Sequence, residues 1–487
     1  MIATGRLTAT LGRRSQRIVY GRPDPEELRA ELDRTTRIDQ AHLVMLVDQG
    51  LISRTDAARI LLAIDRLRRA GFAPLLGLPT PRGLYLAYEN YLIHELGGDV
   101  GGRLHTGRSR NDLKASATAL RLRAVLLELL GELNRLRAVL LSRARAYRAT
   151  IMPVHTHYQP AMPATYGYYL LGVAVALGRD SVALRRCLDD LDRCPLGAGA
   201  ITGTDLPIDP TRTAALLGFV APSLHALDAI ASRDNVLRAL AAAAGAGLTL
   251  SRLATDLQLW STVEFGFVEF PDRLVGGSSA MPQKRNAFLL EHVKAKPAAA
   301  VGAWTAMAQA TATAPFTNSI EVGTEAVAAA WPGFRAVLDA VALSQVLVSG
   351  ARPKPDRMLA GVQDNYVTAT VLANRLVRRG VPFRQAHHQV GAAVRSAIAE
   401  GRRELILDDP SVNGDGAVDS LDEVVAQHRA GGGPGAFDEV FRGVHAELAD
   451  EWGHLNRVRN TLRQARRDLA AAVETLIAEA TGGHGVG

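Results

Sequence analysis

The feature of this sequence that most limits its fold is a run of more than thirty residues that contains no proline. It begins near Asn111 and continues through KASATALRLRAVLLELLGELNRLRAVLLSRARAYRA, with one interior glycine. Helices of this length exceed the globular average and are typical of bundles. Further long helices are predicted from about 160 to 190, 223 to 263, 288 to 312 and 325 to 350. The sequence therefore predicts an all-α fold built around a long central helix bundle.

Composition agrees with this prediction. Aromatic residues make up 5% of the chain and hydrophobic residues 47%, with Ala, Leu and Arg abundant. Ala, Leu and Arg lose little entropy on entering a helix, so they favour helix over sheet. A chain of 487 residues with this apolar content can bury a large core, and its length suggests more than one domain.

The net charge of +7 leaves two interpretations open, a nucleic-acid-binding protein or an arginine-rich solvated surface. The basic residues are scattered along helical segments, with no Lys/Arg block and no interleaved aromatic residues, so we expect no nucleic-acid partner. No stretch approaches the roughly 18 apolar residues of a membrane span. The two cysteines, Cys187 and Cys194, match neither a zinc site nor a disulfide framework, and a reducing cytoplasm is the simplest compartment. The N-terminus carries no apolar segment typical of a signal peptide.

Changes in helix length and loop composition along the chain predict three domains. Gly-rich loops separate the long helices, and after ARPKPD at 351–356 the pattern changes to shorter helices with a GGGPG turn at 431–435. We therefore expect an N-terminal helical domain over 1–106, a central bundle over 107–355 and a C-terminal helical domain over 356–487. The two flanking domains would be smaller helical caps on the bundle.

The segment GGSSAMPQKRN, Gly276–Asn286, is dense in hydrogen-bond donors and precedes a predicted helix. Backbone N–H groups and a helix N-terminus stabilise negative charge, so such a loop suits an anionic ligand. A Gly-Ser loop that merely connects two helices is the alternative, and composition alone leaves both open.

The segment HTGRSRND, His105–Asp112, places several polar side chains at the start of the longest helix. One or two of them are explained as N-caps. The other polar side chains of this segment favour a carboxylate-binding site, because arginine and a helix N-terminus both suit carboxylates.

The segment VHTHYQPAMP contains His155 and His157. A His-x-His pair without a third ligand argues against a metal site, so a general acid/base histidine is the better interpretation, at the mouth of a helix beginning near Pro160. CPLGAGAITG offers spaced glycines, but no strand precedes it and no phosphate-binding lysine follows, which excludes a dinucleotide site.

These three segments, in this order, resemble the signatures of the fumarase/aspartase superfamily and specifically of its argininosuccinate lyase branch. PLGAGAITGTDLPID and GVPFRQAH add to the resemblance, which covers about residues 30 to 400. It implies a fumarase/aspartase-like fold, a homotetramer with each active site assembled from three subunits, and no metal or organic cofactor.

The resemblance also implies the roles of individual residues. Ser278 would be the base that removes the proton, although Ser278 and His157 are both candidates for proton transfer at a given step. Glu291 would orient His157, while Thr156 lies across the substrate and Lys284 stabilises the dianionic aci-carboxylate. The remaining substrate-binding positions would be Ser109, Arg110, Asn111, Gln159, Ser279 and Asn286.

The amine side of the pattern departs from the family. The Tyr, Gln and Lys that bind substrate in argininosuccinate lyases correspond here to Asn318, Gly323 and Ala326. Asp39 stands where a serine is expected and Gly83 where an aspartate is expected. Each lost partner of a buried polar group weakens binding by about 1–3 kcal/mol, so argininosuccinate should bind poorly. Asp39 and Asn318 would instead help to bind a different amine, with Glu321 and Glu325 making the pocket anionic.

The sequence therefore predicts a carbon–nitrogen lyase that releases fumarate from an N-substituted aspartate, or adds an amine or diamino acid to fumarate, in specialised metabolism. A housekeeping argininosuccinate lyase of arginine biosynthesis is the first alternative. A non-catalytic structural homologue is the second, although the presence of all the elimination residues together argues against it.

Overall fold

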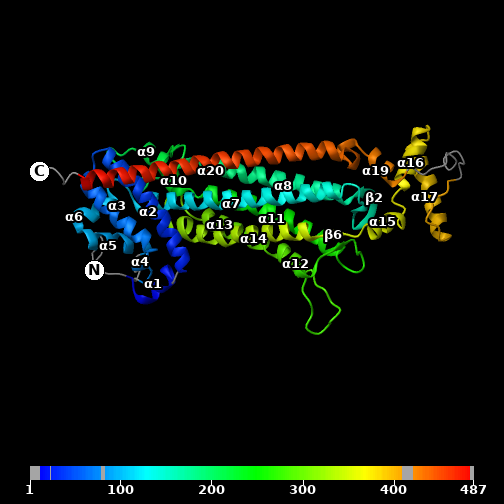
Figure 1. Cartoon of the computed structure of the whole chain (residues 1–487), viewed down its shortest axis with the longest axis horizontal. Coiled ribbons are helices and arrows are strands. Elements are labelled where there is room, and N and C mark those ends of the chain that lie inside the picture. The colour runs from blue at the N-terminus through cyan, green and yellow to red at the C-terminus, as the bar shows by residue number, and fades with distance from the viewer. Residues whose placement is uncertain (1–10, 22–23, 78–82, 408–419, 483–487) are drawn as a thin grey trace.

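The computed structural model describes residues 11–21, 24–77, 83–407 and 420–482. The protein is an elongated helical bundle with a cluster of N-terminal helices at one end and short helices at the other (Figure 1). The all-α prediction is confirmed, since the described strands are all short. The helices of the N-terminal end are α1 (Arg13–Tyr20), α2 (Pro25–Asp48), α3 (Arg54–Arg69), α4 (Ala73–Leu76), α5 (Leu84–Leu96), α6 (Gly98–Gly101) and the 3₁₀-helix η1 (Gly102–His105).

The predicted long helix is α7, Arg110–Ala146, with 37 residues. Its leucines recur at helical spacing and are almost fully buried, including Leu122, Leu126 and Leu133. The one interior glycine, Gly131, gives room to α20: a Cβ there would lie 2.8 Å from Arg459, whose guanidinium donates to the Leu127 carbonyl. The other helices of the central region are α8 (Tyr166–Asp189), α9 (Pro210–Leu216), α10 (Ala226–Ala231), α11 (Asp234–Trp260), α12 (Phe288–Ala295), α13 (Pro297–Ala312), the π-helix η3 (Glu321–Ala326) and α14 (Val327–Gly350).

Three of the predicted helix boundaries are wrong. The helix expected from about residue 160 begins at Tyr166, because 151–165 forms a two-stranded ribbon. Proline cannot donate a backbone hydrogen bond, so Pro153, Pro160 and Pro163 suit such a ribbon better than a helix. The predicted helix from 223 to 263 breaks at extended Ser232. The one from 288 to 312 divides before Pro297, which takes the first turn of α13.

The strands of the described residues form three two-stranded sheets. The largest is an antiparallel hairpin at the far end of α7, and the other two are pairs of two residues that tie loops together. The strands are β1 (Ile151–Thr156) with β2 (Gln159–Thr165), β3 (Arg193–Cys194) with β4 (Ala221–Pro222), and β5 (Val268–Glu269) with β6 (Arg352–Pro353).

The final helix, α20 (Phe437–Gly482), has 46 residues, whereas only shorter helices were predicted after residue 356. It runs back along the bundle and packs against α3, α7 and α8 (Figure 1). Its apolar residues belong to the bundle core at Phe437 and Leu455, and to the N-terminal core at Leu469 and Leu476. The division of the chain near 107 and 355 stays a prediction. The other C-terminal helices are α15 (Pro355–Gln363), α16 (Ala369–Arg378), α17 (Phe383–Ala399) and α19 (Leu421–Gln427).

The large core is formed by α7, α8, α11, α13 and α14, which pack against one another. Two described helical stretches, Asp234–Trp260 and Glu321–Gly350, are long and apolar enough by composition to cross a membrane. About half of each apolar window is buried inside the protein, at 50% and 44%. Core helices of a bundle have this character, so the two stretches are weak evidence for a membrane.

Candidate active site

Of the three segments predicted to carry the chemistry, the first two lie at opposite ends of α7. HTGRSRND precedes α7, the hairpin β1–β2 follows its opposite end, and the loop 276–286 projects from the bundle beside α12 (Figure 1). At 1.5 Å per residue, the 37 residues of α7 extend over roughly 55 Å. A single chain therefore does not bring the first two segments together.

The N-terminal end of α7 is held by its own polar side chains. Ser109 is the N-cap, and its hydroxyl accepts a hydrogen bond from the Asn111 N–H at 3.2 Å. Asp112 completes the capping box and also accepts from the backbone N–H groups of Gly197 and Gly199, at 3.1 and 3.0 Å. The N-cap interpretation is thus confirmed for Ser109, while the carboxylate of Asp112 fastens the glycine-rich loop to α7.

Two predicted binding residues of this segment remain accessible. Arg110 is exposed and makes no ion pair with any described residue. The amide of Asn111 donates to the Ala200 carbonyl at 3.0 Å and accepts from Asn318 at 3.2 Å. Asn111 and Asn318, which are 207 positions apart in the sequence, therefore belong to one polar surface, as the predicted site requires.

The prediction that Asp39 contacts the substrate does not fit the structure. Asp39 is fully buried, with its carboxylate 2.6 Å from the Arg108 guanidinium and accepting from the Tyr88 hydroxyl at 2.8 Å. Burial lowers the pKa of Arg108, but Asp39 and Tyr85 outweigh it and raise that pKa above its usual value. Asp39 therefore neutralises an internal arginine and is not available to a substrate amine. The sequence alone could not show the pairing of Asp39 with Arg108, because α2 and Arg108 meet only in the folded protein.

The second segment forms the tip of the β1–β2 hairpin. Thr156 pairs with Gln159, and the two residues between them, His157 and Tyr158, have φ values of 51° and 63°. Non-glycine residues adopt this left-handed conformation at a cost, and such strain gathers at functional sites. All four side chains are exposed, and none of them forms a hydrogen bond with the described part of the chain. The hairpin presents His157 outward, ready for a partner that this chain does not supply.

The third segment is a loop closed at its base. Gly276 and Asn286 exchange two backbone hydrogen bonds of 2.8 Å, and the Asn286 side chain donates to the Gly277 carbonyl. The hydroxyl of Ser278 accepts from the N–H groups of Ala280 and Met281 at 3.3 and 3.1 Å. Two donors on one oxygen stabilise negative charge there, which is what a serine needs to act as a base.

The loop also carries unpaired polar groups. Ser279 and Lys284 are exposed, and neither side chain has a hydrogen-bond partner among the residues that the structure describes. Arg285 anchors the loop instead, through Asp272 at 2.6 Å and the Phe270 carbonyl at 2.8 Å. Ser278 and Lys284 thus share one short loop, as predicted, with the cation free to approach a ligand.

The predicted pair of Glu291 with His157 does not form within one chain. Glu291 lies on α12, exposed, and accepts from the Gln258 side chain of α11 at 3.3 Å. His155, the other histidine of the hairpin, contacts the rings of Phe265 and Phe267, and burial lowers its pKa. The orienting role of Glu291 remains a prediction that requires a second chain.

Sequence reasoning missed two cations beside the segment 318–326, where this chain departs from the amine-side residues of the family. Lys114, one helical turn beyond Asn111, hydrogen-bonds Thr324 of η3. Arg233 is only 7% exposed, and one of its nitrogens lies 3.9 Å from where a Cβ on Gly323 would be. Burial lowers the pKa of both, to about 10 for Arg233. The i, i+3 spacing of Lys114 from Asn111 was the available signal, since such residues share a helix face.

Among the described residues, no group of three or more His, Cys, Asp and Glu side chains could hold a metal ion. Cys187 and Cys194 are both buried and free, and burial raises the pKa of Cys194 to about 12. The expectation of no metal and no cofactor stays a prediction.

Comparison with known proteins gives a consistent result. A family model described as lyase matches residues 87–302, and one described as argininosuccinate lyase C-terminal matches residues 366–414. An argininosuccinate lyase from Methanoculleus marisnigri is 34% identical over 91% of this chain and 91% of its own length.

Solved structures agree with these sequence matches. A variant of EDDS lyase with bound fumarate has a TM-score of 0.85 and 28% identity, covering 98% of both chains. A class II fumarase from Schistosoma mansoni, at 16% identity, has a TM-score of 0.67 and covers 77% of this chain and 85% of its own, which shows a shared fold. The predicted fumarase/aspartase-like fold is therefore confirmed.

Proposed function

This chain belongs to the fumarase/aspartase superfamily of lyases, on the argininosuccinate lyase branch, and from that premise we propose that it cleaves or forms a carbon–nitrogen bond between fumarate and an amine. The observation that carries this proposal is the loop 276–286, where Ser278 is hydrogen-bonded by two backbone N–H groups beside the free cation of Lys284. EDDS lyase, which shares the fold at 28% identity, binds fumarate in one of its structures. A fumarate-releasing site is consistent with both.

In the cleavage direction, the base removes a proton from the carbon next to a carboxylate. The electron pair moves into that carboxylate, giving an aci-carboxylate with two negative charges. Lys284 and Asn286 would stabilise this species, each such donor contributing about 3 kcal/mol. The pair then returns to form the fumarate double bond as the C–N bond breaks, and the amine leaves with a proton. Ser278 and His157 are the candidates for the two proton transfers.

The distance between the segments supports a shared active site. His157 and the Asn111 surface are separated by the length of α7, roughly 55 Å, so one chain cannot place both on one small substrate. The proposal is a homotetramer in which each site takes the α7 N-terminus, the hairpin tip and the loop from three different subunits. Arg110, His157, Glu291 and Lys284, each exposed in the single chain, would find their partners there.

The amine side of the site differs from an argininosuccinate pocket. Asn318, Gly323 and Ala326 stand where the family has Tyr, Gln and Lys, while Lys114 and Arg233 bring positive charge beside them. Glu31 and Glu325 partly offset the charge of Lys114, but Arg233 forms no ion pair with a described residue, and its charge would repel a bare diamine. We therefore propose that the amine carries its own carboxylate, as a small diamino acid does, since charge-assisted contacts are the strong ones.

The test is a screen by ultraviolet absorbance of fumarate. The protein is incubated with fumarate and a panel of amines that includes matched diamine and diamino acid pairs of equal chain length. The expected result is loss of fumarate absorbance with at least one diamino acid, faster than with its diamine. Argininosuccinate cleavage with kcat/KM at or above about 10⁴ M⁻¹s⁻¹, as in ordinary enzymes, would restore the housekeeping alternative. No conversion of fumarate by any partner, nor release from argininosuccinate, would favour the non-catalytic homologue. A cytoplasmic location is part of the same proposal.

A further inference from the structure

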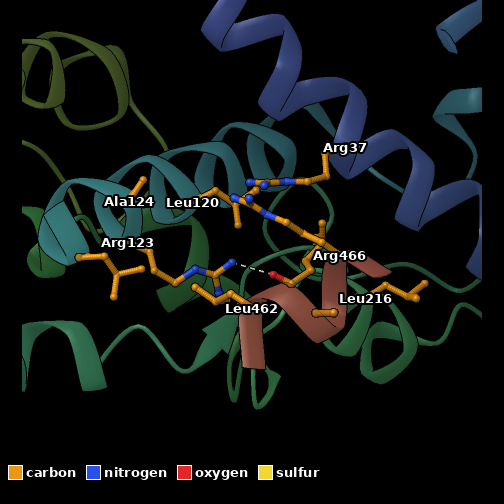
Figure 2. A pocket seen from close by; sticks show the side chains of 10 residues that line it. Arg37, Leu120, Arg123, Ala124, Leu216, Leu462 and Arg466 are labelled. Atoms are coloured by element: carbon orange, nitrogen blue, oxygen red, sulfur yellow. Dashed lines mark hydrogen bonds between the residues drawn. The ribbon is translucent and has the colours of Figure 1, made fainter. Parts of the chain in front are cut away.

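Three arginines from three different helices face one small cavity at the N-terminal end of the bundle. Arg37 comes from α2, Arg123 from α7 and Arg466 from α20, and the cavity has a volume of about 140 Å³ (Figure 2). The rest of its wall is apolar, and none of the described residues that line it is acidic. The cavity lies at the end of the molecule opposite the hairpin that carries His157 (Figure 1).

Arg123 is held in place by neutral groups. Its guanidinium donates to the carbonyls of Gly218 and Leu217 at 2.8 and 2.7 Å and stacks over the Phe219 ring at 4.5 Å. It is only 8% exposed, and burial lowers its pKa to about 10, with Arg37 acting in the same direction. Carbonyl oxygens satisfy its donors without neutralising its charge, so Arg123 remains a net positive charge in the cavity wall.

The side chains of Arg37 and Arg466 extend in the same direction along this cavity, and their guanidinium groups end beside one another near Leu120 (Figure 2). Neither forms an ion pair with any described residue. Burial lowers the pKa of Arg37 to about 10, and Arg466 is the next largest cause. Asp33 opposes this shift, but its carboxylate lies 2.6 Å from Arg68. The two guanidinium groups are therefore neighbouring like charges without an ion pair, Arg37 half-buried and Arg466 exposed.

Like charges that converge on an apolar-walled cavity destabilise a fold unless an anion lies between them. Guanidinium groups arriving from three helices suit an acceptor with oxygens in several directions, as in a tetrahedral oxyanion, whereas the two oxygens of a carboxylate lie in one plane. We propose that this cavity binds a small tetrahedral oxyanion of the phosphate class, either inorganic phosphate or the phosphate group of a monoester. The bound anion would join α2, α7 and α20, and so couple the N-terminal helices to the bundle.

Thermal unfolding of the full-length protein tests this proposal, with inorganic phosphate compared with chloride at equal ionic strength. Phosphate should raise the Tm of the wild type by about 2 °C or more when it saturates the site. The variant Arg466→Gln should lose this rise, since Arg466 is exposed and its replacement removes only a ligand. The variant Arg463→Gln is the matched control on the same helix, because Arg463 bonds Asn460 alone among the described residues, and it should keep the rise.

The phosphate-free arm separates a binding role from a structural one. Without anion, Arg466→Gln should melt at or above the wild-type Tm, because it relieves repulsion from Arg37. Calorimetric titration then distinguishes the two sources: tighter Arg466-dependent binding of glycerol 3-phosphate than of inorganic phosphate assigns a monoester, and the reverse assigns the free ion. An equal phosphate effect in wild type and Arg466→Gln would overturn the proposal. A fumarate effect as large as that of phosphate, and equally dependent on Arg466, would overturn the ligand class.

Discussion

The polar side chains at the two ends of α7 differ in whether they have partners within the same chain. At the N-terminal end, Ser109, Asp112 and the buried pair of Asp39 with Arg108 have partners within the same chain. At the other end, the hairpin tip presents His157 in a strained backbone conformation, exposed and without a side-chain partner among the described residues. The loop around Lys284 resembles the hairpin in this respect.

This difference separates residues that build the site from residues that perform its chemistry. A buried charge without a partner is costly, and at the N-terminal end of α7 the carboxylates of Asp39 and Asp112 have their partners before any ligand arrives. Exposed, unpaired groups on a hairpin and a loop cost the single chain little and become useful when another surface approaches. We therefore expect substitutions of the paired residues at the first end to act on stability, and substitutions of the exposed, unpaired residues, His157 and Lys284 among them, to act on turnover.

The largest expected effect is the loss of stability when the buried pair of Asp39 with Arg108 is broken. Asp39→Asn leaves the charge of Arg108 uncompensated and should lower the free energy of unfolding by about 3–5 kcal/mol. Asp33→Asn is the matched control on the same helix, because its pair with Arg68 is partly exposed, and it should cost about 1 kcal/mol or less. Chemical denaturation of both variants measures the difference. Equal losses would remove the distinction between the two pairs.

The next largest effect concerns the loop. Ser278→Ala should reduce kcat by at least about 10²-fold, because the proton loses its positioned acceptor. The Tm and the oligomeric size should match those of the wild type, since the Ser278 hydroxyl bonds only backbone groups of its own loop. Steady-state fumarate release and size-exclusion chromatography measure the two quantities. Near-normal turnover would exclude Ser278 from the mechanism.

A smaller change is expected at the proposed carboxylate–histidine pair. Glu291→Gln removes a negative charge that would favour the protonated imidazole, so the acidic limb of the pH–kcat profile should move to lower pH. Gln258→Leu is the control, because Gln258 is the partner of Glu291 within one chain. If this control reproduces the shift, Glu291 acts through Gln258, and its proposed contact with His157 is wrong.

The smallest expected effect is a pH dependence of stability at the N-terminal end. His105 lies 3.0 Å from the Tyr85 hydroxyl and 3.4 Å from Glu89; burial first, and then Arg108, lower its pKa from 6.5 to about 4. Between these values the unfolded chain takes up a proton that the folded chain does not, so stability falls as pH falls from 6.5 to 4. His105→Gln should flatten this part of the profile, as measured by Tm against pH. An unchanged slope would contradict the assignment.

Sequence patterns predicted those features that depend on residues close to one another in the chain. The proline-free run, its N-cap at Ser109 and the Ser278 loop with Lys284 all follow from neighbouring residues. The hairpin was not predicted, because a short apolar segment beside His157 is compatible with a helix. Only Pro153, Pro160 and Pro163 taken together favour a strand pair over a helix there. The pairing of Asp39 was missed for another reason: its partner Arg108 lies 69 positions away, and only tertiary packing brings the two together.

One active site is proposed to combine residues from different subunits, and subunit complementation tests this proposal most directly. Ser278→Ala and His157→Asn are purified separately, mixed in equal amounts, dissociated and reassembled, and fumarate release is measured. If the loop and the hairpin of a site come from different chains, each random site has both intact residues about one time in four. Recovery of roughly a quarter of wild-type activity is therefore expected from two inactive parents. Activity that stays at the level of the parents, although mixed oligomers form, would contradict it.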